Sequence, residues 1–335
     1  MGRKPDAFLL PGSPLGQPKD GVARDVTIFV SSSTRPKDEE HEVVQRLLAA
    51  VSSARTMLQL QTARAVVAFD GLGGKPGVTD AMARAYASKI RRVRTALPAH
   101  ADVLVHEPWV HQANSLRCAM RALPRTPLVF VSQDDVQIAG PVDAAMLAPL
   151  LRASLAPRAA TRRGSGGKQA DVQVEYVRLS QTADCQADGL LLHTMRPCQA
   201  HPTNPWLHTL NRWTNRPHLA TRRHYEQRLF ARLPRDAKVT PEQVLDQRAR
   251  SAHAPWPLWS YGQRGEMLRD LHWPVRTADG TLVSKETSNT SGYVHAHLLH
   301  AYVGVNQDVL PEQIECHNYR SRNPQWMLKK DGLKV

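Results

Sequence analysis

The chain contains few cysteines and no long run of hydrophobic residues. Four of its 335 residues are cysteines, and they are too far apart for a zinc motif or a dense disulfide framework. No apolar stretch approaches the length of a membrane-spanning helix. These absences argue against a disulfide-stabilised domain, a zinc module and a transmembrane helix. Cys118 falls within an expected helix, where it is typical of a small core residue.

The N-terminus lacks a targeting signal. The first ten residues have too short an apolar core for a secretory signal, and Asp6 breaks the myristoylation pattern that Gly2 begins. Residues 1–24 are rich in proline, glycine, lysine and aspartate, which predicts a flexible leader. With neither a signal nor an anchor in view, we expect a cytoplasmic protein, and peripheral association with a membrane stays open.

The chain also lacks a complete glycine-rich nucleotide fingerprint. The segment Asp70-Gly-Leu-Gly-Gly-Lys75 has neither the spacing of a dinucleotide-binding loop nor that of a P-loop. Its glycines favour a tight turn or the close approach of a ligand. Asp70 ends an expected strand and is a candidate hydrogen-bond acceptor for a nucleotide base or ribose.

Positive charge is in excess, with a formal net charge of +14. Such an excess can indicate a nucleic-acid partner. The arginines are scattered, however, with the densest clusters at residues 161–168 and 221–224, and no basic helix carries interleaved aromatics. A substrate with a diphosphate would also favour a positive site, so nucleic-acid binding is the lesser alternative.

Strands and helices alternate in the first half of the chain. Short apolar runs typical of buried strands occur at residues 25–30, 65–69, 102–106 and 127–131. Helical patterns separate them at residues 37–51, 79–93 and 110–123. This alternation predicts an α/β fold, in which a mostly parallel sheet with right-handed crossovers is flanked by helices.

The composition changes near residue 180. A helical pattern at 142–155 and an alternating strand at 171–179, expected at a sheet edge, precede this change. We interpret 25–139 and 140–305 as two halves of one domain, the second rich in loops, followed by a polar tail at 306–335.

The second half is dense in tryptophan and histidine. Thr240, Pro241 and Gln243 predict the start of a helix with a capping box. Tryptophans suit either sugar faces or a loop-rich core, and five of them fall in this region: Trp206, Trp213, Trp256, Trp259 and Trp273.

The most informative stretch is 127–136, in which a buried strand runs straight into the adjacent carboxylates of Asp134 and Asp135. Ligands of open α/β sheets bind beyond the carboxyl ends of the strands. Adjacent acids repel each other there unless a divalent cation holds them, and hard cations prefer oxygen ligands. The stretch therefore predicts a metal site, although aspartates are also common in surface turns.

The order of these parts resembles a GT-A glycosyltransferase of the family-two kind over residues 25–276. Gln133-Asp-Asp135 stands where that family has its Asp-x-Asp metal motif, with glutamine in place of the first acid. The resemblance implies a metal-dependent, inverting hexosyl- or pentosyltransferase of glycan biosynthesis. It further implies a UDP-, GDP- or dTDP-sugar donor, a glycan or glycoconjugate acceptor, and Mn²⁺ or Mg²⁺.

The same resemblance assigns roles to single residues. It implies metal binding by Asp135 and His272, with His295, His297 and His300 as rivals for the histidine. It also implies contacts to the donor from the first loop, the second strand, the third helix and the motif itself: Ser33, Thr34, Arg35, Asp70, Asn114, Arg117, Gln133 and Asp134.

A carboxylate of the second half would act as the base. Glu242 stands where the family has the acid pair at the start of a helix, and Glu226 and Asp246 are alternatives. The helix dipole alone would also explain an acid at that position. Two other classes of function stay open, namely another doubly wound nucleotide-binding enzyme, such as a methyltransferase-like protein, and a basic nucleic-acid-binding protein.

Overall fold

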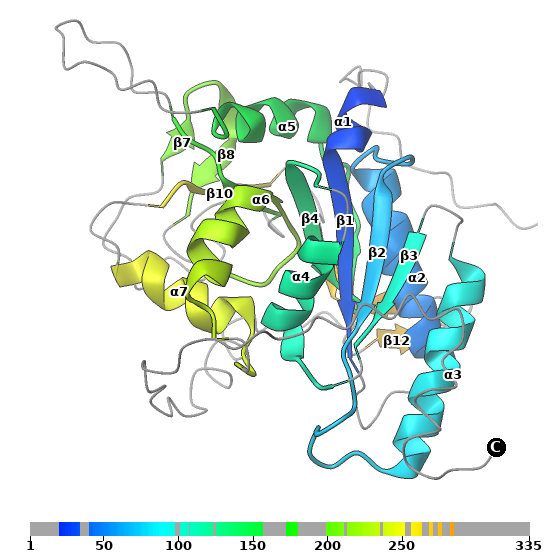
Figure 1. The fold of residues 1–335 in the computed structure, drawn as a ribbon. Helices are drawn as coiled ribbons and strands as arrows, with labels where there is room; N and C mark the ends of the chain where they lie inside the picture. Colours follow the sequence, from blue (N-terminus) through cyan, green and yellow to red (C-terminus); the bar gives the residue numbers. More distant parts are fainter. Residues whose placement is uncertain are drawn as a thin grey trace, which may run out of the picture.

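A nine-stranded sheet forms the centre of the computed structural model (Figure 1), in the order β3-β2-β1-β4-β9-β6-β10-β8-β7. No helix in the described part of the chain combines the length and hydrophobicity that crossing a bilayer requires. The structure describes residues 20–33, 40–97, 101–106, 108–122, 125–156, 172–179, 199–210, 213–234, 237–251, 256–262, 268–270, 274–276 and 282–284.

The first half has the predicted alternation. Its four strands are parallel to one another, and they are β1 (Val26–Ser32), β2 (Arg64–Phe69), β3 (Ala101–Val105) and β4 (Leu128–Gln133). The helices between them are α2 (Glu40–Met57), α3 (Asp80–Ala96) and α4 (His111–Ala122). The predicted α/β fold with a mostly parallel sheet and flanking helices is therefore confirmed.

The second half extends the same sheet beyond β4. Strand β9 (His218–Thr221) is antiparallel to β4, and β6 (Tyr176–Leu179) and β10 (Leu258–Tyr261) follow it. Strands β8 (Asn204–Thr209) and β7 (Ala200–His201) complete the sheet. The prediction that the strand ending at Leu179 lies at a sheet edge was wrong, because β9 and β10 pair with its two sides and all four residues of β6 are buried.

The remaining elements surround this sheet. Two two-stranded sheets pair β11 with β5 and β12 with β13. The bounds of the other elements are α1 (Asp20–Asp25), β5 (Val136–Ile138), α5 (Ala144–Ala153), α6 (Arg222–His224), η1 (Tyr225–Leu229), η2 (Phe230–Arg232), α7 (Pro241–Ser251), β11 (Leu268–Asp270), β12 (Pro274–Arg276) and β13 (Leu282–Ser284).

The core has two layers, one on each face of the sheet. Side chains alternate along a strand, so Ile28 and Val30 pack on one face and Phe29 packs on the other. Residues of α2, α3 and α5 cover the first face, and those of α4, η1 and α7 cover the second. The expected leader, residues 1–24, ends in the helix α1, where Ala23 joins the first layer.

Several local predictions of the second half are confirmed. Thr240 and Gln243 form the capping box, since each donates its backbone N–H to the side chain of the other, at 2.7 and 3.3 Å. Trp213 and Trp259 belong to the core, whereas Trp206 is 40% exposed and Trp273 lies outside the described residues. Cys118 is buried, as expected of a core residue, but it is disulfide-bonded, which the wide spacing of the cysteines did not predict.

A buried carboxylate ties the start of β6 to the turn that follows β9. Glu175 accepts hydrogen bonds from Arg228 Nε at 3.0 Å and from His224 Nδ1 at 3.4 Å. Burial by itself would raise the pKa of Glu175. The hydrogen bonds and charges of His224 and Arg228 outweigh that effect, and the pKa falls to about 2.

We expect the free energy of unfolding to decrease as the pH falls from about 4.5 toward 2. Because the pKa of Glu175 is lower in the folded chain, its stabilisation is complete above the unfolded pKa of 4.5 and is lost through the folded pKa of about 2. At about 1.4 kcal/mol per pKa unit, the loss approaches roughly 3 kcal/mol. Urea unfolding at a series of pH values measures it.

The control is Glu175→Gln, which should remove this part of the pH dependence. Burial also lowers the pKa of His106 to about 4. The free energy of unfolding therefore also decreases through protonation of His106 as the pH falls from 6.5 to 4. A slope between pH 4.5 and 2 that is the same in wild type and Glu175→Gln would contradict the assignment.

Candidate functional site

The candidate site lies at the carboxyl ends of β1 and β4. The sheet order runs outward in opposite directions from these neighbouring strands, and Ser31 is level with Gln133. The helix α2 leaves β1 on one face, and α4 leads into β4 on the other (Figure 1). Open α/β sheets bind their ligands at such a reversal of strand order.

Asp134 is part of a buried network at this edge. Its Oδ2 accepts a hydrogen bond from Ser32 Oγ at 2.5 Å and lies 3.4 Å from Lys89 Nζ, which also donates to Ser32 Oγ at 2.8 Å. Lys89 Nζ further donates to the carbonyl of Ser33 at 3.5 Å. The lysine thus links the ends of both strands and partly compensates the charge of Asp134.

Sequence reasoning missed Lys89, although a signal for it exists. In the expected helix, Lys89 lies between Tyr86 and Ile90 on the apolar side, and all three are buried. A lysine on an apolar helix face needs a partner, since a buried charge without one is costly. The pattern predicts a buried ion pair on that helix, but only the fold identifies Asp134 as the partner.

We expect Lys89→Met to destabilise the protein by about 3 kcal/mol. Methionine keeps the length of the side chain but leaves the carboxylate of Asp134 buried without its cation. Urea unfolding measures the loss, and the double variant Lys89→Met/Asp134→Asn should recover much of it. A single variant as stable as wild type would show that the pair has no net effect.

Asp70 organises the neighbouring loop. Its Oδ1 accepts backbone N–H groups of Gly71, Val110 and His111, at 2.9, 2.9 and 3.1 Å. Burial raises the pKa of Asp70, and these hydrogen bonds oppose the shift. His111 has a positive φ of 63°, a strained backbone of the kind that clusters at functional sites. Gly74, with φ of 77°, makes the tight turn that its position predicts.

The segment after residue 213 reaches the same edge. The amide of Asn215 donates to Gln112 Oε1 at 3.3 Å, and Gln112 Nε2 donates to Ser31 Oγ at 3.4 Å. Tyr176 Oη donates to the carbonyl of Thr214 at 2.8 Å. These side chains form a polar wall between the end of β1 and the second half of the domain.

Two of the predicted donor-binding residues, Asn114 and Arg117, bond backbone carbonyls. Asn114 Nδ2 donates to the carbonyl of Ala237 at 2.8 Å. Arg117 donates to the carbonyls of Leu233 and Pro234, at 2.9 and 3.0 Å. They hold the segment before α7 against α4, so any contact they make with a donor stays a prediction.

The three candidate bases lie in different surroundings. Glu242 is half-buried in the first turn of α7, just after Val239, whose carbonyl accepts the N–H of Ala113 in the first turn of α4. It therefore approaches the carboxyl edge. Asp246 is buried and accepts the N–H of Trp213 at 3.2 Å. The helical turn of Glu226 follows Arg222, whose N–H bonds the carbonyl of Pro127 at the amino end of β4, so the structure does not bring Glu226 to the site.

Asp135 is the acid that the resemblance implies as a metal ligand. It is 6% exposed and directly precedes β5, and Val136 of β5 pairs with Asp270 of β11. His272, two positions later, lies outside the described residues, as do Thr34, Arg35, His295, His297 and His300. Within the described residues no three His, Cys, Asp or Glu side chains gather as a metal site. One carboxylate beside a substrate diphosphate fits Mg²⁺, which commonly binds one or two carboxylates plus phosphate oxygens.

The chain matches no protein-family model and no curated protein. It is similar to the crystal structure of S. aureus TarS, with 9% identity and a TM-score of 0.37 over 72% of this chain and 36% of that one. S. aureus TarS 1–349 is 10% identical, with a TM-score of 0.36 over 72% of this chain and 59% of that one. The apo form of mouse Xyloside xylosyltransferase 1 is 11% identical, with a TM-score of 0.28 over 62% of this chain and 70% of that one. The chain thus spans about a third to three fifths of the TarS structures.

Proposed function

We propose that the protein is a glycosyltransferase that moves a sugar from a nucleotide-diphosphate sugar to an acceptor hydroxyl. The observation that supports this proposal is the meeting of three parts at one sheet edge. These are the acids after β4, the polar end of β1, and the start of α4, which bonds the carbonyl of Val239 three residues before Glu242 of α7. A donor on the first two and an acceptor beside the third would place the reacting atoms between them.

The donor half would bind the diphosphate near Asp135. A bound Mg²⁺ or Mn²⁺ held by Asp135, with His272 implied by the resemblance, would neutralise the charge that develops on the departing diphosphate. Lys89 balances the charge of Asp134, so Asp134 positions the ends of β1 and β4 rather than repelling the donor. Ser33 and Gln133 remain candidates for hydrogen bonds to the nucleoside.

Glu242 would act as the general base. Its carboxylate takes the proton of the acceptor hydroxyl as the acceptor oxygen bonds to the anomeric carbon. The bond between that carbon and the diphosphate oxygen breaks at the same time, and the nucleoside diphosphate leaves. One displacement of this kind inverts the anomeric configuration. Asp246 supports the wall around the acceptor by holding the N–H of Trp213.

A thermal-shift screen tests the proposal. We expect UDP-, GDP- or dTDP-sugars with Mn²⁺ to raise the unfolding temperature, because a ligand at 100 times its Kd stabilises by about 2.7 kcal/mol. S-adenosylmethionine and oligonucleotides serve as controls for the two other classes. Stabilisation by either of them and by none of the sugar nucleotides would contradict a glycosyltransferase.

A further inference from the structure

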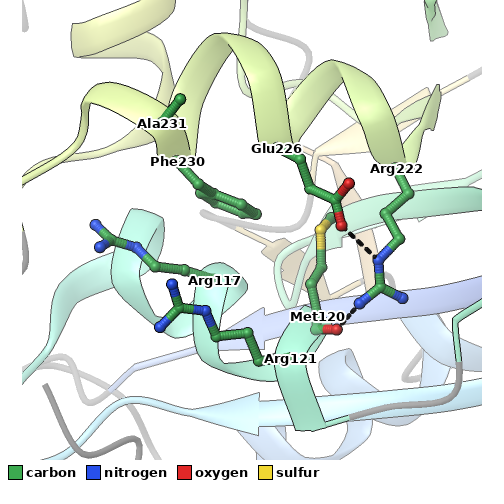
Figure 2. A pocket seen from close by; sticks show the side chains of 7 residues that line it. All are labelled: Arg117, Met120, Arg121, Arg222, Glu226, Phe230 and Ala231. Carbon is green, nitrogen blue, oxygen red and sulfur yellow. Dashed lines mark hydrogen bonds and ion pairs between the residues drawn. The ribbon is translucent and has the colours of Figure 1, made fainter. Parts of the chain in front are cut away.

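A cavity of about 250 Å³ lies between α4 and the turn formed by η1 and η2. Met120 and Arg121 line it from the last turn of α4, and Arg222 lines it from the residue after β9 (Figure 2). The helix α4 starts beside the carboxyl edge of the sheet and ends at the amino edge, where the N–H of Arg222 bonds the carbonyl of Pro127. The cavity therefore extends toward the amino edge, away from Asp134 and Asp135 at the carboxyl edge.

Its lining carries an excess of positive charge. Of the seven lining residues, all of them in the described part of the chain, three are arginines and one is an acid: Arg117, Met120, Arg121, Arg222, Glu226, Phe230 and Ala231. Three guanidinium groups against one carboxylate leave two positive charges around one small cavity. That excess matches a dianion, since a carboxylate ligand would compensate only half of it.

Two of the three guanidinium groups are held in place by the protein. Arg222 Nε donates to Glu226 Oε1 at 3.0 Å, and its Nη2 bonds the carbonyl of Met120. Arg117 is fixed by the carbonyls of Leu233 and Pro234. Figure 2 shows the guanidinium groups of Arg117 and Arg121 side by side, pointing away from Arg222. Because Arg121 is exposed, it can close over a bound ligand.

An aromatic ring bounds the cavity on another side. Phe230 stacks on Tyr225, with ring centroids 5.9 Å apart and planes 25° apart. The preceding turn, Tyr225–Leu229, is a π-helix, a geometry that occurs frequently at functional sites. Glu226 and Phe230, four positions apart on this turn, both line the cavity, so the pocket has an apolar face beside its charged one.

We propose that this cavity is a binding site for a phosphate group, either inorganic phosphate or a small phosphomonoester. Arginine matches phosphate oxygens with paired N–H donors, and the net charge of +2 on the lining balances the −2 of a phosphate dianion. The volume is below the usual range for drug-sized ligands, about 300–1,000 Å³, which favours a small ligand. A planar substituent on the phosphate would lie against Phe230.

Isothermal titration with inorganic phosphate and with phenyl phosphate tests the site, in the presence of a chelator to suppress metal-mediated binding elsewhere. We expect Arg121→Gln to weaken binding about tenfold, the usual effect of losing a hydrogen bond to a charged group. The matched control is Arg91→Gln, an exposed arginine of α3, which should bind as wild type does. Glu226→Gln should strengthen binding roughly threefold, because it removes the competing carboxylate.

Arg121→Gln and Glu226→Gln are expected to change the affinity in opposite directions, which a general structural disturbance would not do. Tighter binding of phenyl phosphate identifies a phosphomonoester as the ligand, whereas tighter binding of inorganic phosphate identifies the free ion; equal binding shows a site for the phosphate group alone. Binding that Arg121→Gln leaves unchanged, or that Arg91→Gln weakens equally, overturns the proposal, as does the absence of binding to both probes. The measurement involves no sugar transfer, so its outcome is independent of the proposed function.

Discussion

Replacing Glu242 with glutamine is expected to lower the rate of sugar transfer by about 10²–10⁴-fold, the usual contribution of a general base. Glutamine keeps the size of the side chain and the start of α7 but cannot accept the proton of the acceptor hydroxyl. Donor binding should be unchanged, because the donor would lie on the strand ends rather than on α7. Single-turnover kinetics with the donor found by the thermal-shift screen, together with donor titrations, separates the two effects.

The two other acids of the second half provide the controls. Glu226→Gln alters a carboxylate whose side chain is 55% exposed at the amino edge of the sheet, so the transfer rate should stay near that of wild type. Asp246→Asn weakens the acceptor for the N–H of Trp213, so we expect it to lower the free energy of unfolding rather than the transfer rate of the folded protein. If Glu242→Gln transfers sugar at the wild-type rate while Asp246→Asn does not, and Asp246→Asn is folded at the assay temperature, the base is Asp246.

Replacing Asp135 with asparagine is expected to lower turnover by about 10²–10³-fold, a loss typical of removing electrostatic stabilisation from the transition state. The amide has the shape of the carboxylate but not its charge, so the fold should persist and metal affinity should fall. Turnover measured against increasing Mn²⁺ should show a weakened metal dependence in the variant.

A matched carboxylate at the other end of the sheet is the control for Asp135. Asp102 lies near the start of β3, is 42% exposed and pairs with Arg64, so Asp102→Asn should leave turnover unchanged. A wild-type protein that keeps full activity with excess chelator would rule out the metal role of Asp135. Sugar transfer without a metal would then remain to be explained by the cationic side chains of the site.

Much of the first half was predictable because its signals are local. The apolar run before Gln133 is a buried strand, and the helix predicted at 79–93 is α3, whose N-cap Thr79 accepts the N–H of Met82 at 3.2 Å. The second half was harder, because several of its strands have only two to four residues. The pattern before Leu179 alternates like an edge strand, yet β6 is central, because its local pattern does not show that β9 and β10, distant in the sequence, will pair with it.

The sequence by itself determined the elements of the first half, the capping box of α7 and the place of Asp134 and Asp135 at a strand end. Those features depend on side-chain periodicity and on bonds between residues a few positions apart. Only the tertiary structure decided that Lys89 neutralises Asp134, that Glu226 lies away from the acids and that three arginines share one cavity. These outcomes join residues from separate parts of the chain, and the packing of helices on both faces of the sheet selects them.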